Sequence, residues 1–145
     1  MGIELQILGL AVVWAVVQLG LFAVPANLEI GSRWLAGPRD EPPEEWMSKG
    51  TARLQRAFLN HIEGLVLHTA ATVVVVMGGA TGPLTAWGAG IYLAARIAYV
   101  PCYWTGVRYL RSAVWAVGLL GTLIMLGAGL VTAWIGGWPS AAAGG

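Results

Sequence analysis

Side chains able to bind a charged ligand recur along one segment of the chain at intervals of three, four and three residues. This row consists of Arg53, Arg56, Asn60 and Glu63. The spacing places the four side chains on one face of an α-helix, within roughly 60° of one another. A second row, with intervals of three and four, consists of Arg96, Tyr99 and Tyr103. Guanidinium groups beside one carboxylate suit a ligand that carries both carboxylate and ammonium groups.

The residues around both rows are apolar, which makes the polar side chains informative. An ionisable side chain inside a membrane span costs from about 3 kcal/mol upward, so it faces a bundle interior or a wet cavity. In a structural interpretation, Glu63 pairs with Arg96 or Arg111 between helices, and Asn60 bonds a backbone carbonyl. In a functional interpretation, the rows form a cationic cleft for an anionic, partly peptide-like ligand. The number of polar groups gathered together favours the functional interpretation.

The composition indicates an integral membrane protein. Hydrophobic residues make up 57% of the 145 residues and charged residues only 10%, against roughly 25% charged in soluble domains. The net charge of +1 leaves no basic stripe to neutralise phosphates, so nucleic acid is not an expected partner. A single cysteine, Cys102, excludes an intrachain disulfide and a multi-cysteine metal site.

The two histidines do not predict a metal site. His61 and His68 are seven residues apart, which separates them by about 10 Å along a helix, and no third ligand is evident. Hydrogen bonding between helices is the favoured role for both. We therefore predict no metal cofactor.

Four stretches of about 20 mostly apolar residues could each cross a bilayer. They lie at residues 3–26, 57–78, 84–104 and 113–137. The predicted fold is an all-α, antiparallel four-helix membrane bundle that forms one domain over residues 1–145. Glu4 and Gln6 are expected at the interfacial end of the first span. Four glycines of the last span are expected to allow close helix packing: Gly118, Gly121, Gly127 and Gly129.

The distribution of cations predicts the orientation. Apart from Arg96, every Lys and Arg falls in or beside the connections at residues 27–56 and 105–112, on one side of the membrane. The positive-inside rule assigns that side, including the long loop 27–56, to the cytoplasm. Both termini are then expected on the opposite side.

The two rows resemble motifs of a known family. Residues 56–63, Arg-Ala-Phe-Leu-Asn-His-Ile-Glu, resemble the R-A-x-x-N-x-x-E signature in the second helix of the MAPEG family, membrane-associated proteins of eicosanoid and glutathione metabolism. The segment from Arg96 to Tyr99 with Tyr103, and then Arg111-Ser112, are similar to motifs of its third helix and the start of its fourth. The resemblance covers essentially the whole chain.

The resemblance implies a homotrimer that holds glutathione, its cosubstrate, at the cytoplasmic side between adjacent subunits. It implies glutathione contacts at Arg33, Arg56, Asn60, Glu63, Arg96, Tyr99 and Tyr103, and activation of the thiol by Arg111 and Ser112. The implied activity is that of a transferase or peroxidase acting on a lipophilic electrophile or hydroperoxide. The implied surroundings are the lipids of a bacterial inner membrane.

The residue types suit this chemistry. Glutathione offers two carboxylates for arginines and an ammonium group for Glu63. A thiol with a pKa of about 8.5 is mostly protonated at neutral pH, and a cation such as Arg111 lowers that pKa and supplies thiolate. Ser112 or Tyr103 could donate a hydrogen bond to the sulfur.

The chain departs from the family pattern at three positions. Leu59 stands where some members carry a second Arg, Gly64 follows Glu63 where others have Tyr, and Trp115 replaces a Tyr of some members. These changes remove polar contacts, so a non-catalytic membrane scaffold or lipid-binding protein of the same fold is the alternative function. A small transporter is disfavoured because the sequence shows no inverted repeat.

Overall fold

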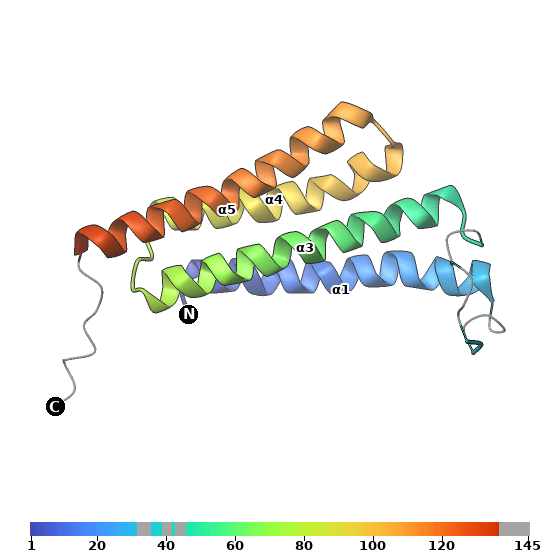
Figure 1. Cartoon of the computed structure of the whole chain (residues 1–145), viewed down its shortest axis with the longest axis horizontal. Coiled ribbons are helices and arrows are strands. Elements are labelled where there is room, and N and C mark those ends of the chain that lie inside the picture. Colours follow the sequence, from blue (N-terminus) through green and yellow to red (C-terminus); the bar gives the residue numbers. More distant parts are fainter. Residues whose placement is uncertain (32–35, 39–41, 43–45, 137–145) are drawn as a thin grey trace.

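The computed structural model describes residues 1–31, 36–38, 42 and 46–136. These residues form four helices: α1 (Ile3–Ile30), α3 (Lys49–Met77), α4 (Pro83–Thr105) and α5 (Arg108–Gly136). No strand occurs among the described residues. Figure 1 shows α1 beside α3 and α4 beside α5, with the connections α1–α3 and α4–α5 at the same end of the bundle. The predicted all-α four-helix membrane bundle is confirmed.

The start of α3 is fixed by a polar cap. The Ser48 hydroxyl accepts a hydrogen bond from the Thr51 backbone N–H at 3.2 Å. The Glu29 carboxylate, near the end of α1, accepts from Ser48 N at 2.7 Å and from Thr51 Oγ1 at 2.8 Å. An N-cap of this kind stabilises a helix by about 1 kcal/mol. The cap explains why α3 begins at Lys49, well before the predicted apolar span 57–78, since apolarity marks only the lipid-embedded part of a helix.

The start of α4 binds the beginning of α1. The Thr85 hydroxyl donates a hydrogen bond to Glu4 Oε1 at 2.6 Å, and the backbone N–H of Gly82 donates to Thr85 Oγ1 at 2.8 Å. Glu4 is only 1% exposed, although it lies at the very start of α1. The physical reason is a hydroxyl partner at a helix N-terminus, where the helix dipole favours an anion.

Close backbone contact joins α4 to α5 at two glycines. A Cβ at Gly88 would lie 2.7 Å from Gly121 O, and a Cβ at Gly121 would lie 2.7 Å from Gly88 O. Gly118 and Gly129 also face neighbouring helices, whereas Gly127 has nothing within 4 Å. The predicted packing role therefore holds for three of the four glycines and is wrong for Gly127.

The polar rows lie on the two central helices. Both α3 and α4 pack against all three other helices. Within the part of the chain that the structure describes, three segments are long and apolar enough to cross a membrane: Ile3–Ile30, Lys49–Met77 and Tyr109–Ile135. The helix α4 is not among them; it carries Tyr92, Arg96 and Tyr99, all buried inside the bundle. Burial of these three side chains inside the bundle is what allows α4 to carry them in a membrane protein.

Candidate functional site

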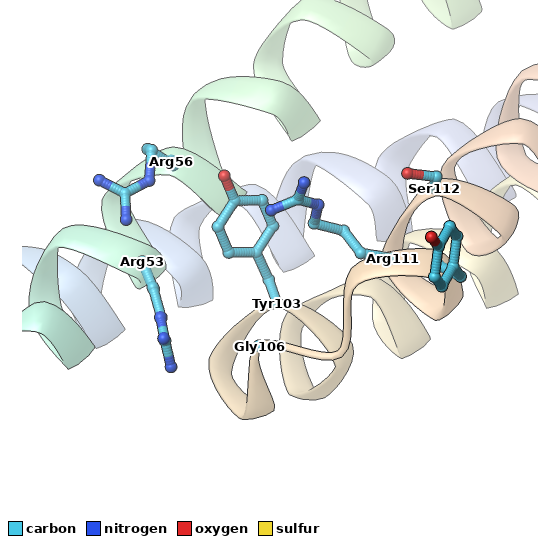
Figure 2. Close-up of a pocket in the computed structure, with 7 residues that line it drawn as sticks. Arg53, Arg56, Tyr103, Gly106, Arg111 and Ser112 are labelled. Atoms are coloured by element: carbon cyan, nitrogen blue, oxygen red, sulfur yellow. The ribbon is translucent and has the colours of Figure 1, made fainter.

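A cleft of about 400 Å³ opens at the end of the bundle where α4 is joined to α5. We call it the cationic cleft, and it is lined by Arg53, Arg56, Tyr103, Gly106, Tyr109, Arg111 and Ser112. Three of these seven residues are arginines, and none of them carries a carboxylate. Figure 2 shows Arg111 reaching from α5 toward Tyr103, with Arg53 and Arg56 on the α3 side. The arrangement is suited to an anionic ligand.

The cleft is shaped by a contact between α3 and the end of α4. Arg53 Nη1 donates a hydrogen bond to the Trp104 backbone carbonyl at 3.0 Å. Gly106 ends α4 in the left-handed conformation, with φ of +78°, which a glycine adopts without strain. A Cβ there would lie 3.1 Å from Arg53 Nη1, so the chain reverses directly over this guanidinium. Arg53 therefore holds α3 against the turn that leads to Arg111.

Arg111 and two tyrosines form a stack at the cleft. The guanidinium carbon of Arg111 lies 4.9 Å from the centroid of the Tyr103 ring. The Tyr103 ring in turn packs against Tyr99, with centroids 5.4 Å apart. Tyr99 is buried, while Tyr103 is half-buried and lines the cleft. Cation–π contact of this kind fixes a guanidinium without neutralising it, so Arg111 keeps its charge for a ligand.

A second, smaller cavity of about 130 Å³ lies deeper along the same helices. We call it the inner cavity, and it is lined by Asn60, Glu63, Gly64, Leu67, Arg96, Trp115, Leu119 and Thr122. Arg96 Nη1 donates a hydrogen bond to Asn60 Oδ1 at 3.1 Å. In the described part of the chain, Glu63 forms no ion pair with Arg96 or Arg111 and Asn60 bonds no backbone carbonyl, so the pairings of the structural interpretation are not found.

Both histidines bond polar side chains of other helices. Nδ1 of His61 lies 3.0 Å from Gln18 Oε1, and Nδ1 of His68 lies 3.1 Å from Thr122 Oγ1. The His68 ring also stacks on Tyr92, with centroids 3.8 Å apart. The predicted interhelical hydrogen bonding is confirmed. Among the described residues, no group of three or more His, Cys, Asp or Glu is placed to hold a metal ion.

A comparison with protein-family models identifies the family of the chain. The model of the MAPEG family matches residues 7–131, which include most of all four helices. The chain belongs to the MAPEG family. Neither the curated proteins nor the solved structures include a significant match.

The structure divides the MAPEG motif residues between the two cavities. Arg56, Tyr103, Arg111 and Ser112 line the cationic cleft, and Asn60, Glu63 and Arg96 line the inner cavity. Tyr99 lies behind Tyr103, and Arg33 lies outside the described residues. The cleft also contains Tyr109, which the sequence indicates only as an interfacial aromatic residue. Sequence reasoning did not single out Gln18 and Thr122, the partners of the two histidines. Only their polar side chains within largely apolar helices indicate that each needs a partner.

One departure from the MAPEG pattern now has a physical explanation. A Cβ at Gly64 would lie 2.8 Å from the central carbon of the Arg96 guanidinium, so a side chain there would push this flexible group aside. Gly64 is therefore the residue that leaves room for Arg96 between α3 and α4.

Proposed function

We propose that this MAPEG protein uses glutathione as a cosubstrate, in a transferase or peroxidase reaction on a lipophilic electrophile or hydroperoxide. The observation that carries the proposal is the cationic cleft, where three arginines line a space free of carboxylates among the described residues. Its volume of about 400 Å³ falls in the range of small-molecule sites, which is roughly 300–1,000 Å³.

The lining residues have distinct roles in this proposal. Arg53 and Arg56 bind glutathione carboxylates, because a guanidinium forms strong charge-assisted hydrogen bonds with them. Arg111 lies beside the thiol and lowers its pKa, while Ser112 and Tyr103 donate hydrogen bonds to the sulfur. Glutathione supplies the thiolate that attacks an electrophilic carbon or a peroxide oxygen.

We further propose that the active unit is a homotrimer with glutathione between subunits. Glu63 is exposed on the surface of a single chain, although its neighbours on α3 are apolar. Leu59 is 50% exposed and Val66 is 65% exposed on that helix. A carboxylate on such a surface suits burial against another subunit and the ammonium group of a shared ligand better than contact with lipid.

The charge distribution supports an orientation with the cationic cleft in the cytoplasm and both termini on the opposite side. For a bacterial-type member, the membrane is then the inner membrane. In this position the cleft meets glutathione from the cytosol, and the second substrate arrives from the bilayer.

The first test is glutathione binding to the purified protein in detergent, by calorimetry. We expect saturable binding together with the ultraviolet absorbance of a bound thiolate. In Arg111→Ala the thiolate absorbance should disappear because the stabilising cation is gone. Absence of binding by a folded, monodisperse protein would contradict the proposal.

A non-catalytic scaffold or lipid-binding protein is the second candidate, and the hydrogen bonds between helices favour it. Gln18–His61, Asn60–Arg96 and Thr122–His68 all join different helices. If the polar residues served only to hold the assembly together, Arg56→Ala and Glu63→Ala would lower its thermal stability in detergent. The same variants would change no ligand affinity.

A further inference from the structure

One carboxylate, that of Glu29, joins the end of α1 to the start of α3. Its Oε2 accepts a hydrogen bond from the Ser48 backbone N–H at 2.7 Å, and its Oε1 accepts one from the Thr51 hydroxyl at 2.8 Å. Glu29 is exposed, whereas Thr51 is only 4% exposed, so the carboxylate closes over a buried hydroxyl. Hydrogen bonds to an ionised acceptor are stronger than those between neutral groups. The first turn of α3 is therefore fixed to α1 at two points.

The same turn of α3 also contacts the end of α4. Arg53, two residues after Thr51, donates from Nη1 to the Trp104 backbone carbonyl at 3.0 Å. The Trp104 indole lies beside the first turn as well, because a Cβ at Gly50 would lie 3.5 Å from Trp104 Nε1. We call this meeting of α1, α3 and α4 the helix junction, and it consists of Glu29, Ser48, Gly50, Thr51, Arg53 and Trp104.

The helix junction is continuous with the cationic cleft. Arg53 belongs to both, since it lines the cleft and holds the end of α4. A Cβ at Gly106 would lie 3.1 Å from Arg53 Nη1, which places the turn directly against the guanidinium. One residue later, the Val107 carbonyl accepts a hydrogen bond from Arg111 N at 3.3 Å, at the start of α5. The position of Arg53 is therefore coupled to the place where Arg111 enters the cleft.

In the described part of the chain, Glu29 does not line the cleft, and its charge has the wrong sign for an anionic ligand. A carboxylate at the same end of the bundle as three arginines repels an anion, so its charge alone lowers the affinity of the cleft. Its hydrogen bonds have the opposite effect. The first N–H groups of a helix have no partner within the helix, and without a cap the first turn frays. Arg53 lies directly after that turn, so fraying would release it from Trp104.

We propose that Glu29 is a positioning residue of the cationic cleft. By capping α3, it keeps Arg53 and Arg56 in place for the ligand, and through Arg53 it holds the turn at Gly106. The proposal rests on the proposed function, because glutathione is the ligand whose binding reports the position of the arginines. A measurement on the turn itself, without glutathione, separates failure of one from failure of the other.

The first test compares two substitutions of Glu29 by calorimetric titration of glutathione into the whole protein in detergent. Glu29→Ala removes the charge and the hydrogen-bond acceptor together. Glu29→Gln removes the charge but keeps both contacts, since its amide oxygen accepts from the Ser48 N–H and its NH2 group donates to the Thr51 hydroxyl. We expect the glutathione Kd to rise about five-fold or more in Glu29→Ala and to stay within about two-fold of wild type in Glu29→Gln.

The second test measures backbone hydrogen exchange without glutathione. In Glu29→Ala, amides at residues 49–52 should exchange faster because the first turn of α3 loses its cap. Amides at residues 105–108 should also exchange faster, by about three-fold or more, although the hydrogen bonds of Glu29 go to Ser48 and Thr51. Arg53→Gln should accelerate exchange at the turn by itself. In that background Glu29→Ala should add no further change there, since the connection through Arg53 is already broken.

The matched control is the other carboxylate–threonine pair of α1. Glu4 accepts from the Thr85 hydroxyl at 2.6 Å and joins α1 to the start of α4, at the end of the bundle away from the cleft (Figure 1). Thr85→Val should lower Tm but leave glutathione affinity and exchange at residues 105–108 unchanged. If Glu29→Ala does not fold, Thr51→Val decides, because it keeps the shape of the side chain and removes only the hydroxyl that Glu29 holds.

Three results would overturn the proposal. One is equal or tighter glutathione binding in Glu29→Ala, which would mean that Glu29 acts through its charge or not at all. Another is a loss of affinity in Glu29→Gln as large as in Glu29→Ala. The third is faster exchange confined to residues 49–52. If the wild-type protein bound no glutathione, the proposed function would fail, and exchange at the turn would still decide whether Glu29 holds it.

Discussion

Polar residues occur both in the cationic cleft and in the interior of the bundle, but their exposure and their hydrogen-bond partners differ between the two regions. In the interior, His61 and His68 each bond a partner on another helix, and both rings are buried. In the cleft, Arg56 and Ser112 are exposed, and Arg111 contacts only an aromatic face in the described part of the chain. The two histidines each join helices through one hydrogen bond, whereas Arg56, Arg111 and Ser112 line a cleft that a ligand can enter. This contrast separates structural from functional polarity within one membrane protein.

The two regions also differ in backbone support. The interior is held by close contact between α4 and α5, where Gly88 and Gly121 bring the backbones together. The cleft lies at the other end of α4, beyond Tyr103, where the chain turns at Gly106. Figure 1 shows the α4–α5 turn at the same end of the bundle as the start of α3, and there Arg53 donates to the Trp104 carbonyl. A binding site needs rigid support, and the close packing of α4 on α5 at Gly88 and Gly121 provides it for the turn beside the cleft.

The largest expected effect is in the cleft. Arg111→Ala should lower single-turnover rates with an electrophile and glutathione by about 10²-fold or more, because the thiolate loses its electrostatic support. The oligomer should stay intact and Tm should fall only slightly, since among the described residues Arg111 is held to α4 by a single cation–π contact with Tyr103. Tyr109→Phe, also in the cleft lining, is the control and should keep the rate. Equal rates in Arg111→Ala and wild type would remove Arg111 from the mechanism.

The next effect belongs to the interior. Gly121→Ala would place a methyl group 2.7 Å from Gly88 O and 2.7 Å from Tyr92 N. Backbone atoms cannot move aside like a flexible side chain, so α4 and α5 must separate. We expect a loss of about 1–3 kcal/mol in the free energy of unfolding, measured by thermal or denaturant unfolding in detergent.

The matched control for this prediction is Gly127→Ala on the same helix. Nothing lies within 4 Å of a Cβ at that position, and alanine favours a helix over glycine by up to about 1 kcal/mol. The control should therefore be neutral or slightly stabilising. If both variants behaved alike, the close contact between α4 and α5 would not govern stability.

The sequence predicts the fold class well because apolar length and cation distribution act locally. It also predicts which faces are polar, since the rows on α3 and α4 follow helical spacing. The sequence does not predict which residues of the two rows line the cationic cleft and which line the inner cavity. Arg96 bonds Asn60 and leaves Glu63 aside, because its guanidinium lies over Gly64, and no spacing rule gives the direction of a long side chain.

The sequence also does not predict which residues pair with the polar side chains of otherwise apolar helices. Gln18 and Glu4 lie 14 residues apart in the mostly apolar α1, so their burial depends on which residue the bundle brings opposite each of them. Their position in an apolar segment predicts that each needs a partner, but the partners, His61 and Thr85, are known only after the helices are assembled. Tertiary pairing, rather than local pattern, decides these positions.

The smallest expected effect tests whether the interior polarity is structural. Thr122→Val removes the hydroxyl that lies 3.1 Å from His68 Nδ1 while keeping the shape of the side chain. Interhelical hydrogen bonds in membrane proteins contribute about 0.6 kcal/mol on average and up to about 1.7, so we expect a loss of this size in unfolding free energy. Glutathione affinity should not change. Thr132→Val is the control, because the exposed Thr132 hydroxyl bonds only Ala128 O of its own helix. A change in glutathione affinity in Thr122→Val, with stability unaltered, would show that the interior and the cleft form one site.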